Sequence, residues 1–291
     1  MRLKAVIRTS PWVEALKDGS VAPSGYELDF EEVQPVTRAF RIMSRELAYD
    51  VCEMAATTYF VARDHGKPFT ALPVFVTRGL HHTAIRAREP GDPRALEGQR
   101  VGVNRGYTVT TGVWARGILA TDYGVDLDRV TWVRTDDEHV AEFEPPSNVE
   151  DLREGESLTD LAALVGEDKS GTLVPLVETA EADAWRALEE RGLWPVNHLV
   201  VVKDDVLAAH PDAAEALFGA FVRARDAYVA GGELLPLHAR VAEVTGGNPL
   251  PYGLDRNRAV VEQLLDHCVA QRILRRRPSL DDLFVPIGGS T

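Results

Sequence analysis

Short apolar segments alternate with amphipathic stretches along most of this 291-residue chain. Apolar runs rich in β-branched residues and bounded by polar turns predict buried strands. The predicted strands are Leu3–Ile7, Tyr49–Cys52, Val74–Val76, Val101–Val103, Val130–Val133 and Leu199–Val202. Strands that alternate with helices indicate an α/β fold with largely parallel sheets.

Apolar residues that recur at helical spacing predict helices between and after these strands. One helix is predicted over Pro35–Leu47, and another opens at His210–Asp212 with Pro211 in its first turn. A further helix is expected from Asp255, its N-cap, to Arg275–Pro278, where proline ends it. The acidic, proline-containing segment Glu144–Glu156 predicts a surface loop.

The length of the chain favours two lobes, because single hydrophobic cores stop growing at about this size. Pro90–Pro93 and Trp194–Val196 are rich in turn residues and predict the crossings between the lobes. We expect one lobe built from residues 1–85 and 200–291, and a second built from residues 86–199. A ligand cleft is expected between them.

The chain is acidic, with 32 Lys and Arg against 45 Asp and Glu and a formal charge of −13. Such a charge repels nucleic acid and anionic membranes, so we expect neither as a partner. Apolar runs are too short for a signal-peptide core or a membrane span, which predicts a cytoplasmic location. Cys52 and Cys268 lie far apart in sequence and predict buried free thiols.

The segment Val103–Gly112 predicts a strand that runs through a polar turn into a helix. A helix start offers unpaired backbone N–H groups and a partial positive charge, which suit a carboxylate or phosphate. Arg105 adds a planar fork of donors. The alternative is an ordinary strand-to-helix junction with a threonine cap. In the binding interpretation, the ligand contacts of this anion seat are Asn104, Arg105, Tyr107, Thr108, Thr110 and Thr111.

Other polar side chains also lie at or near the ends of predicted strands. Ligands of α/β proteins bind beyond the carboxyl ends of the strands, so we expect these side chains to converge on one cleft. They are Arg8, Ser10, Glu53, Arg78, His81, His82, His139, Asn197 and His198.

Several motifs together resemble the 4,5-dihydroxyphthalate decarboxylase family. The motifs are Tyr49–Met54, Gly66–Phe75, Leu96–Val103, the Asn104 turn and His198–Lys203. The resemblance implies a type II periplasmic-binding-protein-like fold, with mixed, mostly parallel sheets in two lobes and an interdomain cleft. It also implies a carboxy-lyase that works without a cofactor on a small anionic aromatic substrate, a hydroxylated acid such as a dihydroxyphthalate.

Such a reaction needs a general acid aimed at the carbon that bears the carboxylate, a partner for the phenol, and a cation for the carboxylate that stays. Histidine titrates nearest neutral pH and suits the acid, while arginine suits the anchor. We therefore expect His82 or His81 as the acid, Glu53 or His198 as the phenol partner, and Arg105 with Arg78 as the carboxylate clamp.

Each of these residues also has a structural interpretation. His81 and His82 point apart in an extended chain, so at most one of them is expected to face the cleft. Glu53 lies between apolar neighbours, where an unpaired charge is unfavourable, so it is either paired or functional. His198 could serve a hinge. Arg8 and Arg78 could pair with acidic residues instead of a ligand.

A divalent metal stays open, because the histidines and Glu53 are suitable ligands, but the chain contains no metal-type spacing. We assign no metal site and expect no cofactor. A carrier of small carboxylates is an alternative function, as is another lyase or a cyclase on the same scaffold. The chain does not fix the oligomeric state, although homodimers are the commonest assembly of soluble enzymes.

Overall fold

The computed structural model describes residues 1–287. The chain divides into two compact units, which are described separately here. Unit 1 contains Met1–Arg78, Val196–Glu262 and the chain from Pro278 onward, and unit 2 contains Gly79–Pro195 and Gln263–Arg277. The predicted boundaries followed residues 85 and 199. Residues 263–277 were predicted for the first lobe, whereas the structure groups them with unit 2.

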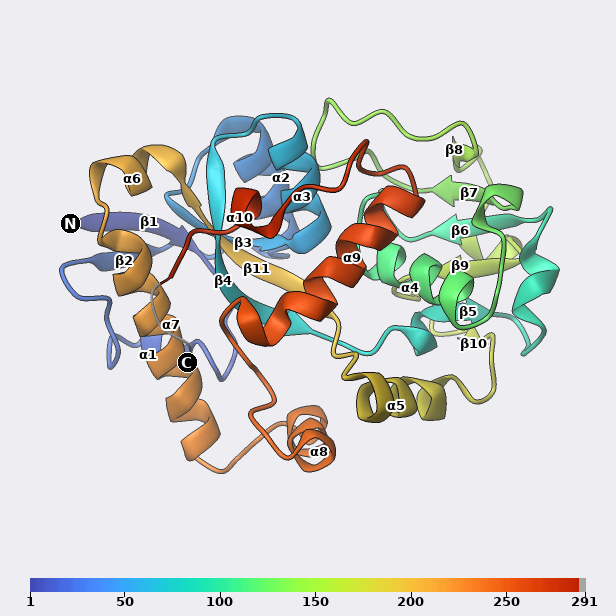
Figure 1. Ribbon diagram of the computed structural model, residues 1–291. Helices are drawn as coiled ribbons and strands as arrows, with labels where there is room; N and C mark the ends of the chain where they lie inside the picture. The colour runs from blue at the N-terminus through green and yellow to red at the C-terminus, as the bar shows by residue number, and fades with distance from the viewer. Residues whose placement is uncertain (288–291) are drawn as a thin grey trace. The chain divides into compact units, whose positions relative to one another are not determined.

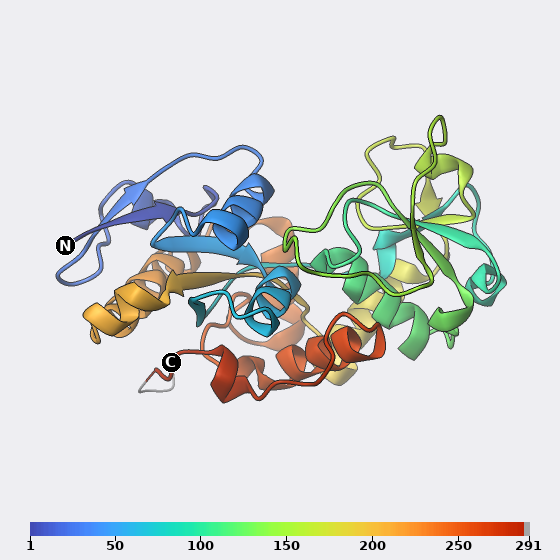
Figure 2. The same ribbon diagram turned by 90° about the horizontal axis from the view of Figure 1, so that it is seen from above.

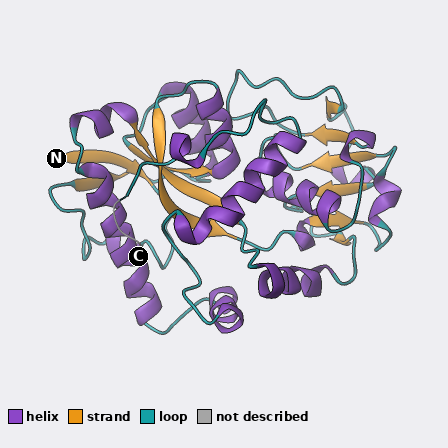
Figure 3. Ribbon diagram, viewed as in Figure 1, coloured by secondary structure: helices purple, strands orange, loops and turns teal. Residues whose placement is uncertain are grey.

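Unit 1 is built on a mixed five-stranded sheet with strand order β2-β1-β3-β11-β4 (orange in Figure 3). Its strands are β1 (Arg2–Val6), β2 (Glu27–Phe30), β3 (Val51–Ala55), β4 (Phe69–Arg78) and β11 (Val196–Lys203). Strand β1 is parallel to β2 and β3, and β11 is antiparallel to β3 and β4. The carboxyl ends of β1, β3 and β4 therefore meet at one edge of the sheet, where β11 begins.

Unit 1 also contains helices that lie wholly within it. They are α1 (Glu14–Lys17), α2 (Thr37–Glu46), α3 (Ala56–Asp64), α6 (Asp204–Ala209), α7 (Ala213–Ala230), α8 (Pro236–Thr245) and α10 (Leu280–Leu283). The apolar stripe of α7 (orange in Figures 1 and 2), which includes Leu217 and Phe221, packs in one core with alternate strand residues such as Leu3 and Val74. Alternation places these strand side chains on one face of the sheet. Helices α2 and α3 contact β3.

Unit 2 is built on a six-stranded sheet with strand order β10-β5-β9-β6-β7-β8. Its elements are β5 (Ile85–Ala87), β6 (Arg100–Val103), β7 (Thr131–Arg134), β8 (Val149–Asp151), β9 (Ala163–Val165), β10 (Val174–Pro175), α4 (Thr110–Thr121) and α5 (Ala180–Arg191). Strands β6, β7, β8 and β9 are parallel, while β5 is antiparallel to β9 and to β10. The loops that follow β6, β7 and β9 therefore leave the sheet at the same edge.

Two predictions need correction. The segment Glu144–Glu156 is not entirely loop, because it contains the edge strand β8, which pairs with β7. This strand is short and none of its residues is buried, so it lacks the alternation of apolar and polar residues that marks a strand. The helix predicted from Asp255 to Arg275–Pro278 is α9, which is shorter and spans only Arg258–Ala270. The division between the units falls within it.

The second half of α9 and Gln271, which follows it, group with unit 2 and contact α4. Arg116 donates from Nε to Oε1 of Gln271 at 2.7 Å, and Nε2 of Gln271 donates to the carbonyl of Val113 at 2.9 Å. The ring of His267 lies edge-on to Trp114, with 5.4 Å between ring centroids. Periodicity in the sequence identifies this helix but does not say which sheet it covers.

The predicted α/β class, with two mixed sheets, is confirmed. Both cysteines are buried and free, as predicted. Among residues 1–287, no helix is long and apolar enough to cross a lipid bilayer.

Candidate functional site

Glu53 and His198 form a carboxylate–imidazole pair in unit 1. Nδ1 of His198 lies 2.6 Å from Oε1 of Glu53, while the backbone N–H of Arg8 donates to Oε2 at 2.8 Å. The three residues come from the edge where β1 and β3 end and β11 begins, as predicted for polar residues at strand ends. Glu53 is fully buried, whereas the His198 side chain keeps 15% of its surface exposed.

The pair determines the charge state of Glu53. Burial raises the pKa of this carboxyl, but the hydrogen bond and charge of His198 and the contacts with Arg8 outweigh burial and lower the pKa overall. Glu53 is therefore ionised at neutral pH and accepts the Nδ1–H of His198. This arrangement fixes the tautomer of the imidazole and leaves Nε2 to exchange a proton.

Arg8 extends the pair toward β4. Its guanidinium donates from NH2 to Oγ1 of Thr77 at 3.0 Å, and Thr77 lies one residue before the end of β4. Phe40 of α2 lies edge-on to the His198 ring at 5.0 Å and limits its rotation. Ser10 and Asn197 lie beside this cluster in the chain and are both half-buried.

Arg78 is held by another part of unit 1. Its NH2 donates to the carbonyl of Pro251 at 3.0 Å and to Oδ1 of Asn257. The guanidinium also lies 5.5 Å from the centroid of the Phe75 ring. Burial lowers the pKa of Arg78 to about 9. NH2 of Arg78 is thus already occupied by two groups of unit 1. The carboxylate clamp formed by Arg78 and Arg105 stays a prediction.

The predicted anion seat in unit 2 already holds an anion, the carboxylate of Glu138. Oε1 of Glu138 accepts the backbone N–H of Tyr107 at 2.7 Å, and Oε2 accepts the N–H of Thr108 at 3.0 Å. The hydroxyl of Thr108 donates to Oε2 at 2.6 Å, and NH1 of Arg134 donates to Oε1 at 3.1 Å. The turn does bind a carboxylate, but the one it binds belongs to the chain.

A side chain on Gly106 would not fit beside this carboxylate. A Cβ at Gly106 would lie 2.6 Å from Oε2 of Glu138. Glycine at this position therefore allows Glu138 to approach the turn closely. Glu138 is 5% exposed, so its charge is largely removed from solvent.

Arg105 occupies the centre of the same turn in a left-handed backbone conformation, with φ of 74°. This conformation costs about 1 kcal/mol for a residue with a side chain. The Arg105 N–H donates to Oγ1 of Thr135 at 2.9 Å, and the N–H of Thr135 donates to the Arg105 carbonyl at 3.2 Å. Nε of Arg105 is buried and has no hydrogen-bond partner among the described residues.

The other residues of the seat have contacts within unit 2. Nδ2 of Asn104 donates to the carbonyl of Glu167, in the loop after β9, at 2.7 Å. Tyr107 is buried under the guanidinium of Arg116, 4.0 Å from its ring centroid, and donates its hydroxyl to the carbonyl of Gln271 at 3.1 Å. Thr110 is buried and Thr111 half-buried in the first turn of α4, and His139 is 8% exposed.

His81 and His82 lie in the interior of unit 2. Nε2 of His82 lies 3.0 Å from Asp122, whose carboxylate also accepts two bonds from Arg191. His82 is 2% exposed and its Nδ1 has no partner among the described residues. His81 is 4% exposed and stacks on Trp114, with 6.5 Å between ring centroids. The structure thus surrounds both histidines with protein.

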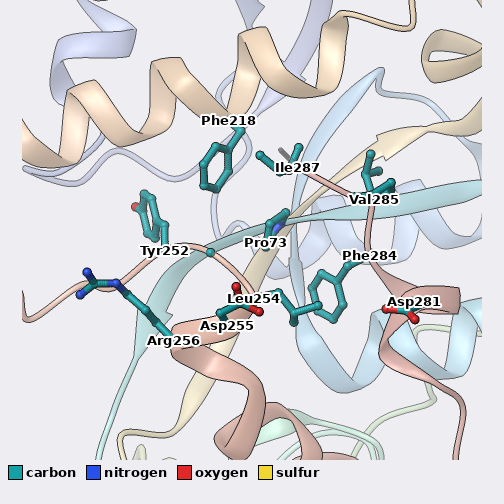
Figure 4. A pocket seen from close by; sticks show the side chains of 12 residues that line it. Pro73, Phe218, Tyr252, Leu254, Asp255, Arg256, Asp281, Phe284, Val285 and Ile287 are labelled. Carbon is teal, nitrogen blue, oxygen red and sulfur yellow. The ribbon is translucent and has the colours of Figure 1, made fainter. Parts of the chain in front are cut away.

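Two of the cavities among the described residues have neither Glu53 nor His198 in their walls. One, of about 300 Å³ in unit 1, is mostly apolar and includes Phe218, Tyr252, Phe284 and Ile287 in its wall (Figure 4). The other, of about 270 Å³ in unit 2, is polar and reaches Asp122. None of the predicted site residues lies in either wall. Among the described residues, no three His, Cys, Asp or Glu side chains are arranged to hold a metal ion.

The sequence interpretation missed the partners of the predicted residues, above all Thr135 and Glu138. Both lie in the loop that follows β7, beside the loop that follows β6. The available signal was the run Asp136–His139 directly after a predicted strand. An acidic run after a strand usually marks a solvated loop, and His139 alone was chosen from it. Thr77 and Asp122 carried no signal beyond their proximity in sequence to Arg78 and to the end of α4.

No family model matches the chain. Two curated proteins are similar in sequence, and both are named 4,5-dihydroxyphthalate decarboxylase. The protein from Comamonas testosteroni is 27% identical and covers 98% of this chain and 97% of its own length. The protein from Pseudomonas putida is 35% identical over 52% of this chain and 62% of its own length. The predicted resemblance to the 4,5-dihydroxyphthalate decarboxylase family is confirmed. The prediction of an enzyme agrees with both names.

Solved structures establish the fold. The periplasmic aliphatic sulphonate binding protein SsuA of Escherichia coli matches with a TM-score of 0.59 over 98% of this chain and 92% of its own, at 10% identity. The desulfurization enzyme DSZB matches with a TM-score of 0.52 over 98% of this chain and 96% of its own, at 15% identity. The chain has the predicted periplasmic-binding-protein-like fold. The interdomain cleft expected from the resemblance stays a prediction.

Proposed function

We propose that this chain is a decarboxylase that removes one carboxylate, as CO2, from a hydroxylated, phthalate-like aromatic acid. The observation that carries this proposal is the similarity to a protein named 4,5-dihydroxyphthalate decarboxylase over 98% of the chain. The pair of His198 and Glu53, joined at 2.6 Å, supports it by supplying a proton-transfer group of the kind that the reaction needs.

In the proposed reaction, a ring carbon that bears a carboxylate accepts a proton while the hydroxyl para to it gives one up. The ring then loses its aromaticity until the bond to the carboxylate breaks. CO2 leaves, the electrons of the broken bond restore the aromatic ring, and the hydroxyl oxygen takes its proton back. One proton replaces one CO2 with no net oxidation, so 4,5-dihydroxyphthalate would give 3,4-dihydroxybenzoate. The hydroxyl oxygen stabilises the protonated ring, and this ring accepts the electrons of the broken bond, so no cofactor is needed as an electron sink and we propose none.

We assign the proton donor to His198 rather than to His82 or His81. The Glu53 carboxylate binds Nδ1 and orients the ring, and Nε2 can then deliver a proton to the substrate. His198 retains exposed surface, whereas His81 and His82 are 4% and 2% exposed. A general acid must come within hydrogen-bond reach of the reacting atom, and exposure is the first requirement for that.

Variants of these histidines test the assignment. His198→Gln should lower kcat by roughly 100-fold or more, because a general acid contributes on this scale. Glu53→Gln should lower kcat less, because the amide can still orient the His198 ring but no longer supplies a negative charge beside it. Both are measured by CO2 release with 4,5-dihydroxyphthalate. If His82→Gln lowers kcat and His198→Gln stays active, the general acid is His82 and not His198.

The wild-type chain tests the function itself. CO2 release and the change in ultraviolet absorbance are recorded with 4,5-dihydroxyphthalate and with phthalate, which lacks the para hydroxyl and should bind without turnover. Binding of both compounds without turnover would favour the carrier of carboxylates. A loss of CO2 release in the presence of a chelator would show that a metal ion takes part in the reaction. The fold occurs in both a sulphonate-binding protein and a desulfurization enzyme, so the fold alone does not decide between these outcomes.

A further inference from the structure

The turn between β6 and α4 has a fixed backbone, and its Arg105 side chain has one buried donor without a partner among the described residues. Both backbone groups of Arg105 are bonded to Thr135, at 2.9 and 3.2 Å. The next two N–H groups on the carboxyl side of Gly106 are bonded to Glu138. Nε of Arg105 is nevertheless buried without a partner among the described residues. Buried donors in folded proteins are nearly always paired, so this one needs an explanation.

We propose that Thr135 and Glu138 are positioning residues, which hold Arg105 in its left-handed conformation so that its guanidinium binds a carboxylate of the substrate. The inference deepens the proposed function and rests on it for the identity of the ligand. It assigns the carboxylate anchor to the Arg105 side chain. The backbone N–H groups of the turn are excluded from that role, because Glu138 already occupies them.

The geometry of Glu138 supports a fixed role. Its carboxylate accepts bonds from two consecutive N–H groups, one hydroxyl and the guanidinium of Arg134, so both oxygens are satisfied. Charge-assisted bonds of this kind are about twice as strong as neutral ones. A substrate carboxylate would have to replace all of them, in a place where Glu138 is 5% exposed. The bonds to Glu138 therefore fix the backbone of the turn, and this backbone sets the position of the Arg105 side chain.

A merely structural turn would not require arginine at its centre. Glycine or asparagine adopts the left-handed conformation more readily than arginine does. Arg272 offers a comparison, since it is also an arginine with positive φ, at 57°. Its guanidinium is exposed and paired with Asp128 at 2.7 Å. Arg105 differs because Nε of its side chain is buried and unpaired among the described residues, and strained backbone positions of this kind cluster at ligand sites.

The experiment measures phthalate binding by isothermal titration calorimetry. Arg105→Asn should weaken binding by about 10- to 100-fold, the loss expected for hydrogen bonds to a charged group. Arg272→Asn is the matched control, because it removes the same charge from the same backbone conformation, and it should bind phthalate like the wild type. Equal affinities of Arg105→Asn and wild type would overturn the inference.

The positioning residues are tested by variants that keep Arg105. Thr135→Val removes the hydroxyl that accepts the Arg105 N–H and should weaken phthalate binding and raise KM, with kcat for 4,5-dihydroxyphthalate within about threefold of wild type. Thr135→Ser should restore both values. Glu138→Gln should also weaken binding. Tighter binding by Glu138→Gln would mean that Glu138 blocks a substrate site, and this result would also overturn the inference.

A stability measurement separates this inference from the proposed function. Arg105→Asn should melt at or above the wild-type temperature, because it relieves backbone strain and breaks no side-chain bond of Nε. A clear fall in melting temperature would show that Arg105 is a structural residue. If the wild type neither binds phthalate nor releases CO2, the proposed function fails. The melting temperature and the amide hydrogen exchange of residues 104–108 in Thr135→Val then still decide whether Thr135 holds the turn around Arg105 in place.

Discussion

His267 shows how strongly burial changes a single side chain in this protein. It is 6% exposed and packs edge-on against Trp114. Burial lowers its pKa from 6.5 to about 4. A pKa that is lower in the folded state means that the unfolded chain binds the proton more tightly.

We therefore expect stability to fall as the pH drops from 6.5 to about 4, the interval set by the pKa of His267 in the two states. The full effect is about 3 kcal/mol. Urea unfolding at several pH values measures it. His267→Gln should be less stable overall but should show a flatter pH dependence in this interval. An unchanged slope would mean that other groups dominate acid unfolding.

At the same scale, the sequence predicted Glu53 better than Glu138. Glu53 interrupts an apolar strand, so its charge had to be paired or functional, and the structure pairs it with His198. Glu138 follows two aspartates after a strand, where carboxylates are usually solvated. Sequence reasoning gave no reason to expect that one of these carboxylates turns inward. The polar ends of strands could be predicted, whereas their partners across neighbouring loops depend on the tertiary fold.

The packing of α4 against α9 depends on a glycine. A Cβ on Gly117 would lie 2.5 Å from the ring of His267, which is itself held against Trp114. Gly117→Ala should therefore destabilise the protein by about 1 to 3 kcal/mol, the usual cost of overpacking, despite the better helix propensity of alanine.

Gly219→Ala in α7 is the matched control for this prediction. A Cβ there would meet the end of the flexible Arg223 side chain at 3.3 Å, which can move away. It should stabilise the protein by up to about 1 kcal/mol. Guanidinium unfolding of both variants measures the difference. A stable Gly117→Ala would show that the two helices can separate without loss.

Among the elements, the six predicted strands correspond to β1, β3, β4, β6, β7 and β11, whereas the short strands β2, β5, β8, β9 and β10 were not predicted. All five residues of β3 are buried, so its apolar run is continuous. β10 is only two residues long, and neither of them is buried. Such strands exist because a neighbouring strand offers hydrogen bonds, and local sequence does not carry that information.

At the scale of the whole molecule, each unit is assembled from separate parts of the chain. Residues 79–195 form most of unit 2, but Gln263–Arg277 complete it. Without them, Arg116, which is fully buried, loses its bond to Gln271, and Trp114 loses the ring of His267. A buried donor left without its hydrogen-bond partner is destabilising by about 1 to 3 kcal/mol.

We therefore expect a fragment of residues 79–195 to lack a cooperative thermal transition, measured by circular dichroism. A fragment that joins residues 79–195 to 263–277 through a flexible linker should recover one. Cooperative unfolding of the shorter fragment would show that α9 is dispensable for unit 2. The same contacts explain why turn signals near residues 90 and 194 could not place residues 263–277, since those signals mark crossings and carry no information on helix packing.

The placement of α9 also affects the order of events during protein synthesis. A ribosome makes the chain from its N-terminus, and domains made of one continuous segment can fold as they emerge. Here the sheet of unit 2 leaves the ribosome long before Gln263–Arg277, and β11 is made well after the strands of unit 1 between which it inserts. The sheet of unit 1 and the cover over α4 of unit 2 are therefore completed only by late segments. We expect apolar surface to stay uncovered during synthesis, which favours binding of the nascent chain by chaperones.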